Sequence, residues 1–139
     1  EKIRTLKGIV FINDTTSTTP VAGQKALAAI SKPIVLLAGG ATKNLDLTDF
    51  AKDVADKVKA VILLEGTATD DLQREIIKFG GGDKIVNRYK TFEPAIRKAY
   101  EVAAKGDAVL LSPVCSSFCM FVNEYDRVDQ FKSVVKKLT

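Results

Sequence analysis

Histidine and tryptophan are absent from this chain of 139 residues, which also has only two cysteines and one methionine. Without histidine the chain lacks the most common general base near neutral pH, the Ser-His and Cys-His nucleophile pairs, and the usual zinc-ligand sets. Two cysteines are too few for a disulfide scaffold and suit a reducing cytosol. Cys115 and Cys119 are four residues apart, which is not the Cys-x2-Cys redox spacing, so we expect both to be buried structural residues.

Long apolar runs and runs of one charge are also missing. No stretch approaches the roughly 20 apolar residues that span a bilayer, so we expect no membrane segment. The net charge of +4 comes from 21 basic residues scattered among 17 acidic ones, which argues against nucleic-acid binding. Residues 1–7 lack a hydrophobic signal core and do not begin with Met, which suggests either a natural fragment or a trimmed form of a longer protein. We expect that protein to be cytoplasmic. We expect a monomer.

Five short apolar runs rich in β-branched residues predict buried strands, at 8–12, 33–38, 60–64, 84–87 and 108–111. Segments with apolar residues at helical spacing predict helices, at 20–31, 46–56, 70–79, 92–103 and 121–138. Strands that are continuously apolar suit a parallel sheet covered on both faces. The sequence therefore predicts one α/β domain over residues 1–139. Its expected fold is a Rossmann-like, doubly wound, mostly parallel sheet of about five or six strands with helices on both faces.

In such a fold ligands bind outside the carboxyl ends of the strands, so the loops that follow the strands are the candidate sites. The first loop, 13–20, contains Asp14 and five consecutive hydroxyl side chains before a helix that begins at Thr19-Pro20. These residue types cap helices, and they also bind anions together with the N–H groups of a helix N-terminus. Both interpretations remain open from composition alone.

Two further loops carry polar groups. The second, 39–46, has two glycines followed by Lys43, and it lacks the Gly-Lys-[Ser/Thr] ending of a P-loop. Lys43 is either a ligand-binding cation or a solvated surface lysine. The third loop, 112–121, is rich in hydroxyl groups and contains both cysteines. A metal site there would need ligands that the chain does not supply, because histidine and further cysteines are missing.

These three loops, in this order and after these strands, resemble the C-terminal domain of the Mur ligases over nearly the whole chain. Residues 8–15 are similar to the family's Gly-Val-x-Phe-x-Asn-Asp-Ser motif, and residues 39–46 to its Gly-Gly-x-x-Lys-x-x-Asp loop. Most specific is the segment 106–118, which is close to Gly-Asp-x-Val-Leu-Leu-Ser-Pro-Ala-Cys-Ala-Ser of the members that add D-glutamate.

The resemblance implies an ATP- and Mg²⁺-dependent ligase that joins D-glutamate to UDP-MurNAc-L-alanine through an acyl phosphate, in bacterial peptidoglycan synthesis. The central ATPase domain and the N-terminal UDP-binding domain would lie outside this chain, so the isolated chain is expected to be inactive. By position, the ATP contacts implied are Asp14, Thr15 and Thr16. The D-glutamate contacts implied are Thr18, Lys43, Ser117 and Phe118, with no metal ligand in this domain. A cation and hydroxyl donors on one rim suit a dianionic amino acid.

The sequence departs from the family pattern at several positions. Thr16 stands where the family usually has lysine, Ala41 where aspartate is common, and Asn123-Glu124-Tyr125 where it has Asn-Phe-Glu. The Asp-Asn-Pro-Arg signature of the relatives that add diaminopimelate or lysine is absent, which favours D-glutamate as the acceptor. The alternative is a stand-alone α/β module that binds an anionic metabolite or nucleotide without catalysis.

Overall fold

The computed structural model describes residues 1–14, 19–40, 46–112 and 124–139. At its centre is a six-stranded sheet in the order β1-β2-β6-β3-β4-β5. Its strands are β1 (Lys2–Leu6), β2 (Ile9–Asn13), β3 (Ile34–Gly39), β4 (Ala60–Leu64), β5 (Ile85–Tyr89) and β6 (Ala108–Leu111). All neighbouring strands are parallel except the pair β1–β2. The predicted α/β fold with a mostly parallel sheet is confirmed.

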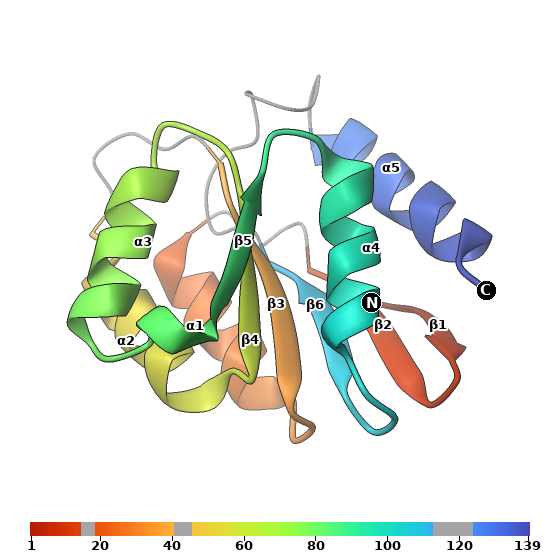
Figure 1. Ribbon diagram of the computed structural model, residues 1–139, viewed down its shortest axis with the longest axis horizontal. Coiled ribbons are helices and arrows are strands. Elements are labelled where there is room, and N and C mark those ends of the chain that lie inside the picture. The colour runs from red at the N-terminus through yellow and green to blue at the C-terminus, as the bar shows by residue number, and fades with distance from the viewer. Residues whose placement is uncertain (15–18, 41–45, 113–123) are drawn as a thin grey trace.

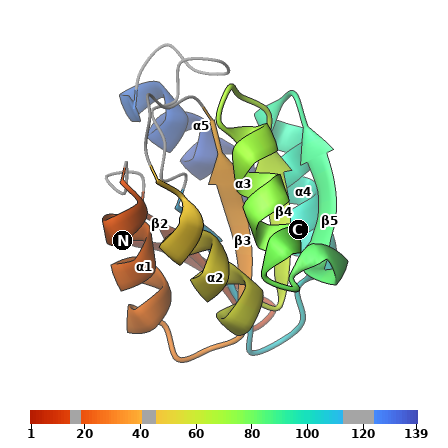
Figure 2. The ribbon, with the colours of Figure 1, turned by 90° about the vertical axis from the view of Figure 1, so that its left-hand side faces the viewer.

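Helices cover both faces of this sheet (Figures 1 and 2). One face is covered by α1 (Pro20–Ala29), α2 (Thr48–Lys57) and α3 (Thr69–Lys78), and the other by α4 (Phe92–Val102) and α5 (Glu124–Lys137). A short 3-10 helix, Gly82–Lys84, precedes β5. Within the described parts of the chain, no helix is both long and apolar enough to cross a membrane.

The core has two halves because successive strand residues point to opposite faces. Leu36 of β3 packs with Phe50 of α2 and Leu72 of α3 on one side. Its neighbour Leu37 packs on the other side, in the cluster that contains Phe92 of α4 and Phe131 of α5. All six residues of β3 are buried. This explains why the central strands read as continuously apolar in the sequence.

The strand β1 was not among the predicted strands. It lies at the edge of the sheet, carries Lys2 and Arg4, and joins β2 through a two-residue turn. Lys7 and Gly8 both have positive φ there, at 52° and 79°, as in the type I′ turns that match the twist of a hairpin. Gly8 therefore belongs to the turn and not to the strand predicted from residue 8. Arg4 donates to the carbonyls of Val135 and Leu138 and so caps the end of α5.

Two predicted helix boundaries are explained by specific contacts. Thr19 caps α1 by accepting a hydrogen bond from the N–H of Ala22 at 3.2 Å, and Pro20 occupies the first turn, as the sequence predicted. The glycines after α3 end that helix, because Gly80 adopts a φ of 87°. The N–H of Gly81 then returns to the carbonyl of Ile76 at 2.9 Å.

The amino ends of the strands are fastened by one buried carboxylate. Asp107, directly before β6, accepts from Lys59 Nζ at 2.5 Å and from the N–H of Ala104 at 2.8 Å. Its side chain is only 6% exposed. Burial raises the pKa of Asp107, but the hydrogen bonds from Lys59 and Ala104 outweigh it and hold the pKa below its ordinary value. Asp107, which belongs to the 106–118 motif, therefore has a structural role at the amino ends of the strands.

Candidate functional site

The carboxyl ends of β2, β6 and β3 are adjacent at the opposite edge of the sheet. Leu111 at the end of β6 pairs with Asn13 of β2 on one side and with Leu37 of β3 on the other. Each of the three loops singled out in the sequence begins at one of these strand ends. Their first described residues are Asp14 after β2, Gly40 after β3 and Ser112 after β6. The three loops therefore leave the sheet from neighbouring positions at one edge.

Asp14 is anchored to β6 through both its backbone and its side chain. Its N–H donates to the carbonyl of Leu111 at 2.8 Å, and its carboxylate accepts from the hydroxyl of Ser112 at 3.5 Å. Asp14 is one of the residues that line a hollow of about 390 Å³ between α1 and the sheet. Apolar side chains, among them Ile12 and Ala26, form most of its wall. Asp14 thus offers a half-buried acceptor beside an apolar surface.

The end of β3 is held by the segment that follows β4. The carbonyl of Gly40 accepts from the N–H of Ala68 at 2.9 Å, and the N–H of Gly40 donates to the hydroxyl of Thr69 at 3.4 Å. Gly39 and Gly40 have φ values of 128° and 132°, which side-chain-bearing residues rarely adopt. A Cβ on Gly66 would lie 2.3 Å from the carbonyl carbon of Gly40. The two backbones therefore touch where the 41–45 segment begins.

The other end of the 41–45 segment is held by Asp46. Its carboxylate accepts from the N–H of Thr48 at 2.9 Å, at the first turn of α2. Hydrogen bonds from Thr48 lower the pKa of this exposed carboxyl below its ordinary value. An ionised carboxylate is also favourable at the positive end of a helix. The Gly-Gly-x-x-Lys-x-x-Asp pattern thus places a fixed residue at each end of the segment that carries Lys43.

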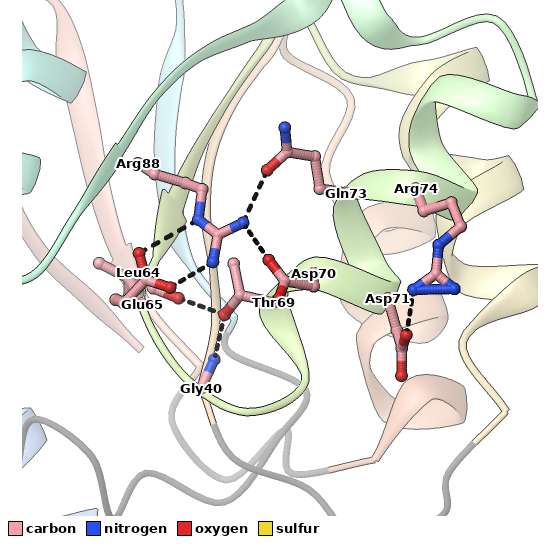
Figure 3. Close-up of polar contacts among 9 residues, drawn as sticks. All are labelled: Gly40, Leu64, Glu65, Thr69, Asp70, Asp71, Gln73, Arg74 and Arg88. Carbon is pink, nitrogen blue, oxygen red and sulfur yellow. Dashed lines mark hydrogen bonds and ion pairs between the residues drawn. The ribbon is translucent and has the colours of Figure 1, made fainter.

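A charged cluster lies beside Gly40, at the ends of β4 and β5 (Figure 3). The guanidinium of Arg88 binds both carboxylate oxygens of Glu65, and it also donates to Asp70 at 2.7 Å and Gln73 at 2.9 Å. The hydrogen bond to Glu65 is the main reason that the pKa of Arg88 is raised. Glu65 and Asp70 stand at the two ends of the segment that holds Gly40. Arg88 therefore ties these ends together.

Of the site residues expected from the sequence, Asp14 lies within the described part of the chain, at the predicted edge. The other expected site residues lie in the segments 15–18, 41–45 and 113–123, which are outside the described part of the chain. They are Thr15, Thr16, Thr18, Lys43, Ser117 and Phe118. Cys115 and Cys119 lie outside it as well. Among the described residues, no group of three or more His, Cys, Asp or Glu side chains could hold a metal ion.

The loop after β4 was not among the candidate sites predicted from the sequence. Gly66 and Thr69 lie between the end of the buried strand β4 and the first turn of α3, as Gly40 lies just after β3, and the same strand-end rule would have selected them. Arg88 had no such signal, because it lies within β5.

Comparison with known proteins adds a family to this geometry. Residues 1–115 match the family model described as Mur ligase, glutamate ligase domain. The chain is similar to the UDP-N-acetylmuramoylalanine--D-glutamate ligase of Roseiflexus sp. (strain RS-1), with 44% identity over 139 residues. It is 41% identical over 138 residues to the ligase of the same name from Caldanaerobacter subterraneus subsp. tengcongensis. These matches cover 100% and 99% of this chain and 30% of each relative, so the chain spans about 30% of the length of these curated relatives.

The fold is also similar to a solved domain assigned to a UDP-N-acetylmuramate:L-alanyl-gamma-D-glutamyl-diaminopimelate ligase of Haemophilus ducreyi 35000HP. The TM-score is 0.62, and the match covers 99% of this chain and 94% of the other. Only 12% of the aligned residues are identical, so this likeness supports the fold alone.

Proposed function

Because the family model covers residues 1–115, the chain belongs to the Mur ligase family, as its glutamate ligase domain, and we propose that its protein adds D-glutamate to UDP-MurNAc-L-alanine. The relatives that carry this name match almost all of the chain. The proposed protein is a MurD-type ligase of bacterial peptidoglycan synthesis, monomeric and cytoplasmic. We propose that residues 1–139 form one domain of it, which binds the acceptor amino acid.

Ligases of this family use ATP. In the proposed reaction ATP phosphorylates the L-alanine carboxylate, and the amine of D-glutamate then attacks the acyl phosphate and releases phosphate. This domain contributes by holding D-glutamate so that its amine lies next to the carbonyl carbon of the acyl phosphate, which is catalysis by positioning. The residues assigned to this task are Thr18, Lys43, Ser117 and Phe118. Lys43 supplies the cation, and the hydroxyl groups donate to the two carboxylates.

For the nucleotide, the proposal assigns Asp14, Thr15 and Thr16 to the contacts with ATP. The half-buried carboxylate of Asp14 is an acceptor for a ribose hydroxyl, and the apolar hollow beside it leaves room for a bound group. We propose that Mg²⁺ is bound mainly by the ATPase domain that the family resemblance implies.

The observation that carries the proposal is the convergence of three loops on one edge. Asp14, Gly40 and Ser112 each follow the end of one of three adjacent strands. The segments that contain the residues proposed to contact ATP and D-glutamate therefore all leave the sheet from one side. A dianionic substrate needs several donors that converge from different elements, and an edge of this kind supports them.

The test is the amino-acid dependence of ADP release by the full-length ligase, with ATP, Mg²⁺ and UDP-MurNAc-L-alanine present. We expect turnover with D-glutamate and none with L-glutamate, L-lysine or diaminopimelate. Preference for any of the other three would contradict the proposal. The isolated chain serves as the second measurement, and we expect no ATP hydrolysis from it. Mg²⁺-dependent ATP turnover by the chain alone would contradict its role as one domain of the ligase.

A further inference from the structure

We propose that Thr69 is a positioning residue for the acceptor site, because it fixes Gly40 and thereby sets the place from which the Lys43 segment leaves the sheet. The inference rests on the proposed function, in which Lys43 binds a carboxylate of D-glutamate. It adds a residue that touches no substrate and lies at the start of α3.

Thr69 is fully buried at the start of α3, and its hydroxyl is used in both directions. It donates to the carbonyl of Leu64 at 2.6 Å and accepts from the N–H of Gly40 at 3.4 Å (Figure 3). One hydroxyl therefore links the last residue of β4 to the residue after β3. A buried side chain with two backbone partners has little freedom to move.

Two further contacts make Gly40 a fixed point. Ala68 donates its N–H to the carbonyl of Gly40 at 2.9 Å, so both backbone groups of Gly40 are bound by neighbouring residues of one loop. Gly66 of this loop lies so close to Gly40 that an added Cβ would overlap its backbone. The segment 41–45 starts from this point, and Lys43 follows Gly40 by three residues.

The loop that holds Gly40 is itself tied at both ends. Arg88 joins Glu65, before the loop, to Asp70, after Thr69. The N–H of Glu65 also donates to the carbonyl of Tyr89 at 2.9 Å. These contacts therefore link β5, through residues 65–70, to Gly40, and Thr69 is the side chain that makes the final contact with Gly40.

The experiment measures D-glutamate kinetics of the full-length ligase with Thr69→Val, which keeps the shape of the side chain and removes both hydrogen bonds. Loss of the Thr69 hydroxyl, one of the three contacts that hold Gly40, should raise KM for D-glutamate about tenfold, as for one hydrogen bond of ordinary strength. KM for ATP should stay within about twofold. Thr69→Ser keeps the hydroxyl and should restore most of the affinity. If Thr69→Val does not give folded enzyme, Thr69→Ala removes the same bonds and is measured in its place.

Ile76→Val is the matched control, since Ile76 is fully buried on the same helix and has no part in holding Gly40. It should cost about as much stability as a lost hydrogen bond and leave KM for D-glutamate unchanged. A similar rise in KM for the Ile76 variant would overturn the inference, because a general loss of stability would then explain both.

A double-mutant cycle with Lys43→Ala tests whether Thr69 acts through Lys43. If it does, Thr69→Val should add little to the KM of the Lys43→Ala enzyme. An equal effect in both backgrounds, or a KM for Thr69→Val within about twofold of wild type, would overturn the inference alone. If Lys43→Ala itself left KM for D-glutamate unchanged, the proposed acceptor site would fall, and the inference with it.

Discussion

The two edges of the sheet are held by similar interactions, but these interactions end in different places. At the amino ends of the strands, which we call the amino edge, Asp107 binds Lys59 and Ala104. Neither partner leads into a segment with a proposed substrate contact. At the carboxyl edge, Thr69 binds Gly40, which is the base of a further segment. Removing the amino-edge contacts should therefore lower stability alone. Removing the carboxyl-edge contacts should also change how a substrate is bound.

The largest stability effect is expected from Gly66→Ala at the carboxyl edge. The added Cβ would lie within 2.5 Å of three backbone atoms of Gly40, and backbone cannot move aside as a flexible side chain can. We expect a loss of about 3 kcal/mol in the free energy of unfolding, measured by urea denaturation of the chain. Gly82→Ala is the control, because the atom nearest to its Cβ would be a side-chain carbon of Ile77 at 3.4 Å, an ordinary contact distance. Equal stability of the two variants would contradict the close contact.

Asp107→Ala at the amino edge should cost about 2 kcal/mol in the free energy of unfolding. The substitution removes a buried carboxylate that accepts hydrogen bonds from Lys59 and Ala104. Because the Lys59 side chain is 40% exposed, solvent weakens the contribution of its ion pair with Asp107 to stability. In the full-length ligase, kcat/KM for D-glutamate should stay within about twofold of wild type. A large kinetic loss would show that the two edges are not separate in function.

The pH dependence of stability gives a smaller signal from the same residue. Because the folded state lowers the pKa of Asp107, its contribution is present above the unfolded value of about 3.9 and is lost as the pH falls through the folded pKa. The stability difference between wild type and Asp107→Asn should therefore shrink as the pH falls below about 4. A difference that stayed constant down to pH 2 would mean that the charge of Asp107 contributes nothing.

The smallest effect is expected from Arg74→Ala on the surface of α3. Asp71 and Arg74 pair at 2.5 Å, but both side chains are about two-thirds exposed. Exposed pairs of this kind contribute at most about 0.5 kcal/mol. Urea denaturation should show a loss of no more than about 0.5 kcal/mol in the free energy of unfolding. A loss above about 1 kcal/mol would contradict the expectation that exposed pairs stabilise the fold less than buried contacts do.

The central strands could be predicted from the sequence because burial on both faces makes them continuously apolar, as in β3 and β4. The strand β1 escaped prediction, since an edge strand with Lys2 and Arg4 lacks that pattern. The sequence also predicted that Asp14 lies at the carboxyl ends of the strands, because the loops that follow parallel strands leave the sheet on one side. The bond between Gly40 and Thr69 could not be predicted, because it joins residues 29 apart whose meeting depends on how β3 pairs with β4.

The assignment of Lys43 to the acceptor site is tested most directly by comparing two lysines, one from each end of the strands, in the full-length ligase. Lys43→Ala removes the proposed cation of the acceptor site, and Lys59→Ala removes the partner of Asp107. Loss of a charge-assisted hydrogen bond of roughly 1.5 to 3 kcal/mol predicts that kcat/KM for D-glutamate falls about 10- to 200-fold for Lys43→Ala. It should change less than about twofold for Lys59→Ala. A Lys43→Ala enzyme within twofold of wild type would make Lys43 a solvated surface lysine and contradict the assignment of the acceptor site to this edge.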